Sequence, residues 1–204
     1  MEMIILGMLM FKRFTIYEMR NYIHTNLRAM CSDSVGSIQA TIKKLLANEM
    51  IIYNEYVENS VNKKLYEITD LGRQRFSELV QKPMAAGKMK NMELSKLYFM
   101  GLVPKTERIP LIDAYIKELQ EELNHMHGIE YAVKQIGSEK EKYVAAIKSD
   151  LKYAEDMMRY SGHSSLTDSI NDIIEFTLCT LEYGLRITEF ELSWYIELRE
   201  RMMK

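Results

Sequence analysis

A chain of 204 residues is long enough for one large domain or two small ones, and 47% hydrophobic with 27% charged residues is typical of a folded protein with a substantial core. Cys31 and Cys179 are too far apart for a zinc or redox motif, so the sequence predicts no disulfide framework and favours a reducing, cytoplasmic setting. The longest apolar run, 3–11, is far shorter than the roughly 20 residues of a membrane span, so no membrane partner is expected.

The net charge of -2 is unevenly distributed along the chain. Residues 1–82 contain 11 Lys and Arg against 9 Asp and Glu, whereas residues 83–204 contain 16 against 20. The small basic excess at the N-terminal end permits nucleic-acid binding without establishing it, because what matters is whether the basic side chains share one face.

The first 48 residues have the pattern of three helices. The apolar segment 3–10 is typical of a buried first helix. The segment 15–18, Thr-Ile-Tyr-Glu, matches a capping box that begins a second helix, which is expected to end at about Arg28. Ser34 is placed to cap a third helix that ends near Asn48, with Ile38, Ile42 and Leu45 facing inward.

The pattern then changes to that of a hairpin. Residues 51–57 are rich in β-branched and aromatic types and predict a strand, 58–63 a polar tip, and 64–68 the partner strand. A helix is expected from Thr69-Asp70 to about Gln81, and the Pro and Gly residues of 83–87 predict a hinge. We therefore expect a winged helix-turn-helix domain over 1–82 and a hinge over 83–92.

Residues 93–204 predict an all-helical second domain, with helical periodicity in 93–101, 105–127, 139–160 and 166–203. In the last segment, apolar residues recur in steps of four and three, which predicts a dimerisation seam. Its members are Ile170, Ile174, Thr177, Leu181, Leu185, Thr188, Leu192 and Tyr195. Two alternatives stay open: the helix bends or breaks at Gly184, or part of the seam packs on its own domain.

The third helix and the wing carry the candidate DNA contacts. With the apolar residues inward, the outward face of the third helix is small, polar and basic, and Gln39 is suited to adenine while lysines reach phosphate or guanine. The alternative is that this face of the third helix is simply solvated and contacts no DNA. The expected DNA-contacting residues are Thr15, Tyr17, Ser34, Ser37, Gln39, Thr41, Lys43, Lys44, Asn62, Lys63 and Lys64.

No catalytic or metal site is predicted. His125 and His127 are two residues apart, a spacing that does not converge on one metal on a helix, and no phosphate-binding glycine loop or nucleophile elbow occurs. No cofactor is expected. The many methionines and tyrosines allow a pocket for a small aromatic effector that includes Tyr183 and Trp194, although such residues more often form core or dimer contacts.

Seven segments, in order, resemble the PadR family of bacterial transcriptional regulators, in particular the subfamily with a helical C-terminal domain that includes phenolic-acid repressors and a virulence-gene activator. They are ILGML (5–9), IYEM (16–19), VGSIQATIKKL (35–45), KLYEITDLG (64–72), LSKLYFMGL (94–102), LEYGL (181–185) and ELSW (191–194). The resemblance implies a homodimer held by C-terminal helices, bound to a palindromic double-stranded DNA operator, and usually repression. Ile16 and Gln39-Ala40 depart from the family pattern, which has Gly and Tyr-Pro there.

The expected protein is therefore mainly α, with an N-terminal winged helix-turn-helix, a two-stranded wing and an all-helical C-terminal dimerisation domain. The expected function is that of a dimeric DNA-binding regulator rather than an enzyme, released from DNA by a small effector. The alternative is a winged-helix protein-interaction module that dimerises without reading DNA.

Overall fold

The computed structural model describes residues 1–28, 30–58, 60–84 and 94–203, and its contacts divide the chain into two compact units. The first consists of Met1–Met84 together with Val144–Ser169. The second consists of the described residues within 85–143 and 170–204. The expected domain limits, 1–82 and 93–204, stay a prediction about folding, and most of the expected hinge, 83–92, lies outside the described residues.

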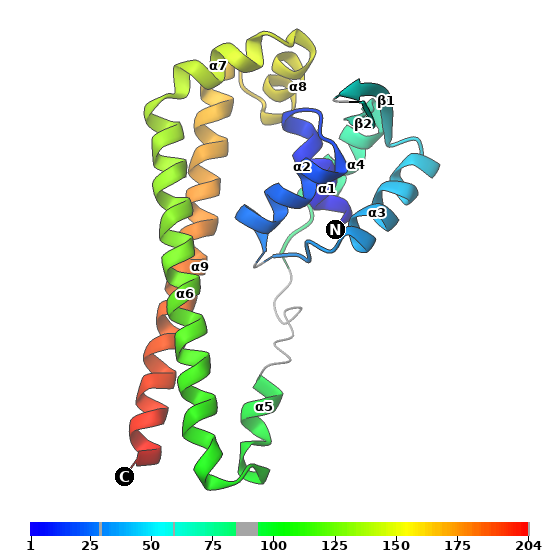
Figure 1. Ribbon diagram of the computed structural model, residues 1–204. Helices are drawn as coiled ribbons and strands as arrows, with labels where there is room; N and C mark the ends of the chain where they lie inside the picture. The colour runs from blue at the N-terminus through cyan, green and yellow to red at the C-terminus, as the bar shows by residue number, and fades with distance from the viewer. Residues whose placement is uncertain (29, 59, 85–93, 204) are drawn as a thin grey trace. The chain divides into compact units, whose positions relative to one another are not determined.

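The first unit opens with three helical segments (Figure 1). α1 spans Glu2–Phe11, α2 spans Ile16–Tyr22 and continues as a π-helical turn over Ile23–Leu27, and α3 spans Val35–Ala47. These bounds confirm the three helices expected from the sequence, with the second ending one residue before Arg28. The capping box is present, because the Thr15 hydroxyl accepts the amide of Glu18 at 3.2 Å and the Glu18 carboxylate accepts the amide of Thr15 at 2.7 Å.

A single apolar core holds the N-terminal part of this unit together. It combines one face of α1 with the inward residues of α2, α3 and the base of the hairpin, and each of these side chains is almost fully buried. Burial of a large aliphatic side chain contributes roughly 1.5–3 kcal/mol, so this core fixes the orientation of α3. Its members include Ile5, Leu6, Leu9, Met19, Ile23, Ile38, Ile42, Leu45, Ile51 and Ile68.

The hairpin is longer than the sequence predicted. β1 spans Ile51–Glu58 and β2 spans Val61–Ile68, paired antiparallel from Ile51 opposite Ile68 to Glu58 opposite Val61. Asn62 and Lys63, expected in the tip, lie within β2 instead. Polar residues such as Asn62 and Lys63 are typical of a turn, but a strand that is exposed to solvent accepts polar side chains when cross-strand partners match them.

A fourth helix, α4, spans Asp70–Val80 and packs against α1. The Thr69 hydroxyl caps it by accepting the amide of Gly72 at 3.1 Å. A Cβ on Gly72 would lie 2.0 Å from the carbonyl oxygen of Met50, so only glycine allows α4 to begin this close to the start of β1.

The second unit is built on two long helices. α5 spans Leu94–Tyr98, a 3-10 turn spans Met100–Leu102, and α6 spans Lys105–Ser138. α6 runs antiparallel beside α9, which spans Leu166–Met203 and is unbroken at Gly184 (Figure 1). The sequence predicted α6 only to His127.

A break in the expected helix 139–160 separates α7, Lys140–Lys148, from α8, Leu151–Ser161. Asp150 caps α8, since its carboxylate accepts the amide of Tyr153, and Gly162 ends it in the left-handed conformation with φ 74°. α8 belongs to the first unit although it follows α6 in the chain. Within the described residues, no helix combines the length and apolarity that crossing a membrane requires.

Candidate nucleic-acid interface

The third helix presents the outward face that its sequence predicts. Ile38, Ile42 and Leu45 are buried in the core, which turns the opposite side of α3 to solvent. The exposed residues on that side are Gly36, Gln39, Ala40, Lys43, Lys44 and Ala47. A helix whose exposed face carries small side chains between a glutamine and two lysines has the shape and the donors needed to enter a major groove.

The other predicted contacts of α3 are partly engaged in the helix itself. The Ser34 hydroxyl accepts the amide of Ser37 at 3.3 Å, and the Thr41 hydroxyl donates to the Ser37 carbonyl at 2.9 Å. Their contacts with DNA stay predictions.

At the start of α2, the Thr15 hydroxyl is held in the capping box, where it also donates to the Glu18 carboxylate at 2.9 Å. Tyr17 is largely exposed. Of these two predicted contacts, Tyr17 is therefore the side chain that is free to reach outward.

Carboxylates of the same unit engage most of the predicted cationic donors. Lys44 Nζ lies 3.6 Å from Glu2, which also accepts a 2.8 Å hydrogen bond from Arg75. The Arg75 hydrogen bond is the main cause that lowers the pKa of Glu2. On the wing, Lys63 pairs with Glu58 and Lys64 with Glu55.

Lys43 differs from the other candidate lysines. Among the described residues, no carboxylate lies within ion-pair distance of its Nζ. Its exposed position on α3 makes it the most available of the four candidate lysines to a phosphate.

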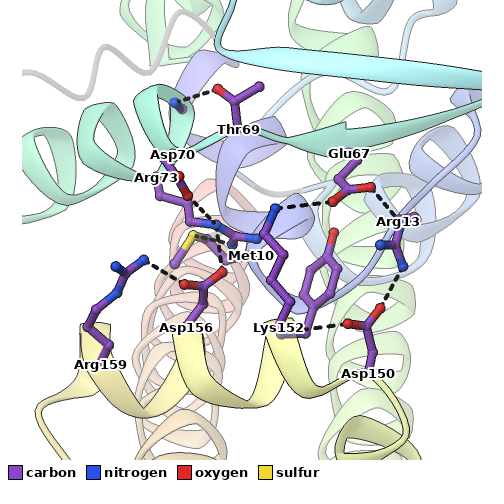
Figure 2. Close-up of polar contacts among 12 residues, drawn as sticks. Met10, Arg13, Glu67, Thr69, Asp70, Arg73, Asp150, Lys152, Asp156 and Arg159 are labelled. Carbon is purple, nitrogen blue, oxygen red and sulfur yellow. Dashed lines mark hydrogen bonds and ion pairs between the residues drawn. The ribbon is translucent and has the colours of Figure 1, made fainter.

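A network of ion pairs and hydrogen bonds, called here the polar joint, links α8 to the rest of the first unit (Figure 2). Arg13, between α1 and α2, donates to Glu67 of β2 at 2.8 Å and to the α8 cap Asp150 at 2.6 Å. Lys152 Nζ lies 3.6 Å from Glu67. These contacts raise the pKa of Arg13, mainly through Glu67, and lower that of Asp150, mainly through Arg13. The joint therefore holds the start of α8 against the base of the wing.

The second half of the joint is buried. Arg73 of α4 is fully buried, with its Nε 2.9 Å from Asp156 of α8 in an ion pair that is not aligned as a hydrogen bond. Asp156 also accepts a 2.5 Å hydrogen bond from Arg159. The guanidinium groups of Arg13 and Arg73 both lie over the Tyr153 ring, 5.2 and 5.3 Å from its centroid.

Sequence reasoning missed this joint, because its partners lie in segments that are far apart in the chain. No local signal marks Arg73, because only its burial in the structure shows that it needs an anionic partner.

Most of the predicted dimerisation seam packs within the chain. Ile170, Leu185, Thr188 and Tyr195 are buried, Ile174, Leu181 and Leu192 are half-buried, and Thr177 is exposed. The C-terminal part of the seam packs on α6. There the Tyr195 ring lies 4.7 Å from the Tyr115 ring, in a cluster with Ile112 and Leu119. This supports the alternative that part of the seam packs on its own domain, and contact of the seam with a second copy stays a prediction.

The opposite face of α9 exposes a second apolar stripe. Phe176, Tyr183 and Phe190 are 68%, 60% and 66% exposed, and Ile187 lies between them at 37%. Their spacing of seven, four and three residues places them on one side of the helix, as in a coiled-coil heptad. The sequence pattern predicted only the seam through Leu185 and not this second stripe.

The two residues of the predicted effector pocket do not converge. Tyr183 and Trp194 are three helical turns apart on α9, about 16 Å along its axis. Trp194 is half-buried and packs edge-to-face on Tyr195 at 5.0 Å, while Tyr183 is exposed. A pocket formed by both stays a prediction.

The sequence matches no protein-family model and no curated protein, but solved structures match the whole chain. Bacillus subtilis PadR, solved in complex with operator DNA, matches with a TM-score of 0.65 at 17% identity, over 98% of each chain. The chain has the fold of the PadR regulators.

Two further structures support the PadR fold. A PadR-like transcriptional regulator from Bacillus cereus matches with a TM-score of 0.54 at 19% identity, over 95% of this chain and 94% of that one. The Vibrio cholerae virulence activator AphA matches with a TM-score of 0.59 at 15% identity, over 98% and 96%. At these identities the likeness is one of fold, and it confirms the mainly helical architecture with an N-terminal winged helix.

Proposed function

We propose that this protein is a DNA-binding transcriptional regulator in which α3 enters the major groove. The outward face of α3 carries the proposal: Gln39 and Lys43 are exposed beside Gly36 and Ala40, which have no bulk to keep the helix from the bases. The PadR fold supports this function, since Bacillus subtilis PadR was solved with operator DNA on the same architecture.

We propose that the protein acts as a homodimer on a palindromic operator. The stripe of Phe176, Tyr183, Ile187 and Phe190 supports a second copy as its occupant, because α6 covers the opposite face of α9 and heptad spacing suits a helical partner. A two-fold dimer would present two α3 helices to half-sites about one helical turn of DNA apart, or a multiple of that distance.

We also propose that the protein represses transcription and that a small aromatic effector releases it from DNA. The effector part is supported by the likeness to Bacillus subtilis PadR, which was also solved in complex with p-coumaric acid. A thermal-shift titration with p-coumaric acid as the probe tests the effector part: a saturable rise in Tm supports it, and an unchanged Tm argues against this class of ligand.

The rival function is a winged-helix protein-interaction module that dimerises without reading DNA. The ion pairs that engage Lys44, Lys63 and Lys64 favour it, because they reduce the cationic character of the candidate interface.

A gel-shift assay at low salt, with DNA from upstream of the protein's own gene, separates the two functions. Retardation of that DNA supports the regulator. A confirmed dimer that retards no DNA supports the interaction module.

A further inference from the structure

The donors on the wing are engaged by two glutamates of the same hairpin. Lys63 Nζ forms an ion pair with Glu58, and Lys64 Nζ lies 3.4 Å from Glu55. The side-chain amide of Asn62 also donates a hydrogen bond to the Glu55 carboxylate, at 3.3 Å. All three wing residues that the sequence predicted to meet DNA therefore hold a carboxylate in the free protein.

The register of the hairpin produces these contacts. Glu55 lies directly opposite Lys64, and Glu58 lies opposite Val61, so that Lys63, two residues further along β2, is its diagonal neighbour on the same face. Opposite charges in cross-strand positions stabilise a hairpin modestly. The pairing therefore follows from the fold of the wing and does not require a bound partner.

These pairs are solvated and open to exchange. The side chains of Lys63, Glu58, Lys64 and Glu55 are 39%, 52%, 45% and 48% exposed, and exposed ion pairs contribute little to stability. Lys64 also lies over the Tyr53 ring, at 4.1 Å from its centroid, which keeps its ammonium group near the strand surface. A DNA phosphate that approaches the wing would compete with Glu55 and Glu58 for the same donors.

We propose that Glu55 and Glu58 are intramolecular competitors of DNA phosphate for the wing donors, and that they lower the affinity of the wing for any duplex. Each glutamate does so in two ways, by occupying a lysine and by repelling the approaching phosphate. This inference rests on the proposed DNA-binding function and adds to it a pair of residues that set the affinity.

A wing restrained in this way contributes little sequence-independent affinity. Phosphate contacts supply most of the binding to DNA of any sequence, whereas side chains in the groove read bases. Competition at the wing therefore leaves a larger share of the binding free energy to α3, where Gln39 and Lys43 are exposed.

The test measures DNA binding by the full-length chain and its Glu55→Gln, Glu58→Gln and double variants. Fluorescence anisotropy is recorded over a series of KCl concentrations with two probes, a random-sequence 30-base-pair duplex and a duplex selected by the wild type from a random pool. Each single variant should bind both probes about two- to fivefold more tightly, the range expected for an exposed pair. The double variant should steepen the slope of log K against log[KCl] by about one to two.

A matched control keeps the change in charge but moves it away from the wing. Glu121 and Glu139 also form exposed pairs, with Lys117 and Lys142, so the double variant Glu121→Gln/Glu139→Gln removes the same charge and should leave affinity close to that of the wild type. Adding Lys63→Ala and Lys64→Ala to the wing double variant should abolish its gain.

The outcomes separate this inference from the proposed function. A wild type that binds DNA while the wing variants show the same affinity and salt slope overturns the inference alone. A control that gains as much as the wing variants also overturns it, because the effect would then come from net charge. If the wild type selects no duplex from the pool, and neither it nor the wing double variant binds the random-sequence duplex, the proposed function fails as well.

Discussion

Arg73 of α4 is fully buried, and its Nε lies 2.9 Å from the carboxylate of Asp156 in α8, so a charge pair in the interior joins two segments that are far apart in the sequence (Figure 2). Burying two charges costs several kcal/mol of desolvation, and their attraction offsets that cost only while both partners are present. The pair therefore makes the docking of α8 sensitive to the loss of either side chain.

The substitution Asp156→Asn should destabilise the protein strongly. It leaves Arg73 with Asp70, which is 3.9 Å away and largely exposed, as its remaining ion-pair partner among the described residues. Breaking a buried pair costs about 3–5 kcal/mol. Urea denaturation should show that loss in the free energy of unfolding, whereas Asp113→Asn, which breaks the exposed pair with Arg199, should cost about 1 kcal/mol or less. Equal losses would contradict the structural role of the buried pair.

Tyr153 should make stability fall at alkaline pH. Burial, together with the nearby charge of Glu67, raises the pKa of Tyr153 to about 12. The unfolded tyrosine loses its proton near its ordinary value of 10, so between about pH 10 and 12 the folded state holds the extra proton and stability decreases as pH rises.

Comparison with Tyr153→Phe isolates this effect. The Tyr153 hydroxyl is buried without a hydrogen-bond partner among the described residues, so its removal should cost little at pH 7. The stability of the wild type should drop relative to the variant by about 1.4 kcal/mol per pH unit within that window, measured by denaturation at each pH. Parallel pH profiles for the two proteins would show that Tyr153 does not titrate as described.

The double substitution Lys43→Ala/Lys44→Ala should weaken DNA binding and flatten its dependence on salt. Each lost phosphate contact reduces the slope of log K against log[salt] by about 0.9 for B-DNA. Lys117→Ala, on α6, serves as a charge control that should leave the slope unchanged. An unaltered slope in the α3 variant would remove both lysines from the interface.

Phe190→Glu should convert the proposed dimer to a monomer. The substitution places a charge in the exposed stripe of α9 without touching the core against α6. Sedimentation velocity should detect the change in mass, and Tyr131→Glu, at an exposed aromatic position on α6, should leave the assembly intact. A dimer that persists in Phe190→Glu would contradict this position of the dimer contact and favour the seam that includes Leu181 and Leu185.

The sequence predicted best what depends on local interactions. The capping box at Thr15, the cap at Ser34 and the outward face of α3 follow from residues within a few positions of one another, and the structure has all of them. The predicted length of β2 was wrong, because the polar residues Asn62 and Lys63 resemble a turn until their cross-strand partners are known.

Long-range contacts were beyond the reach of the sequence pattern. The pairing of Arg13 with Asp150 depends on how two distant segments meet, and neither residue has a local signature for it. α9 carries two apolar stripes with similar spacing, one through Leu185 and one through Tyr183, and periodicity alone does not say which one packs on α6.

Selection of DNA by the purified protein from a random double-stranded pool, followed by sequencing, tests most directly whether α3 reads bases. We expect enrichment of a palindromic sequence with half-sites about one helical turn apart, or a multiple of it, and loss of preference at one or more positions in Gln39→Ala. A pool that remains random after repeated rounds with a confirmed dimer would contradict this expectation.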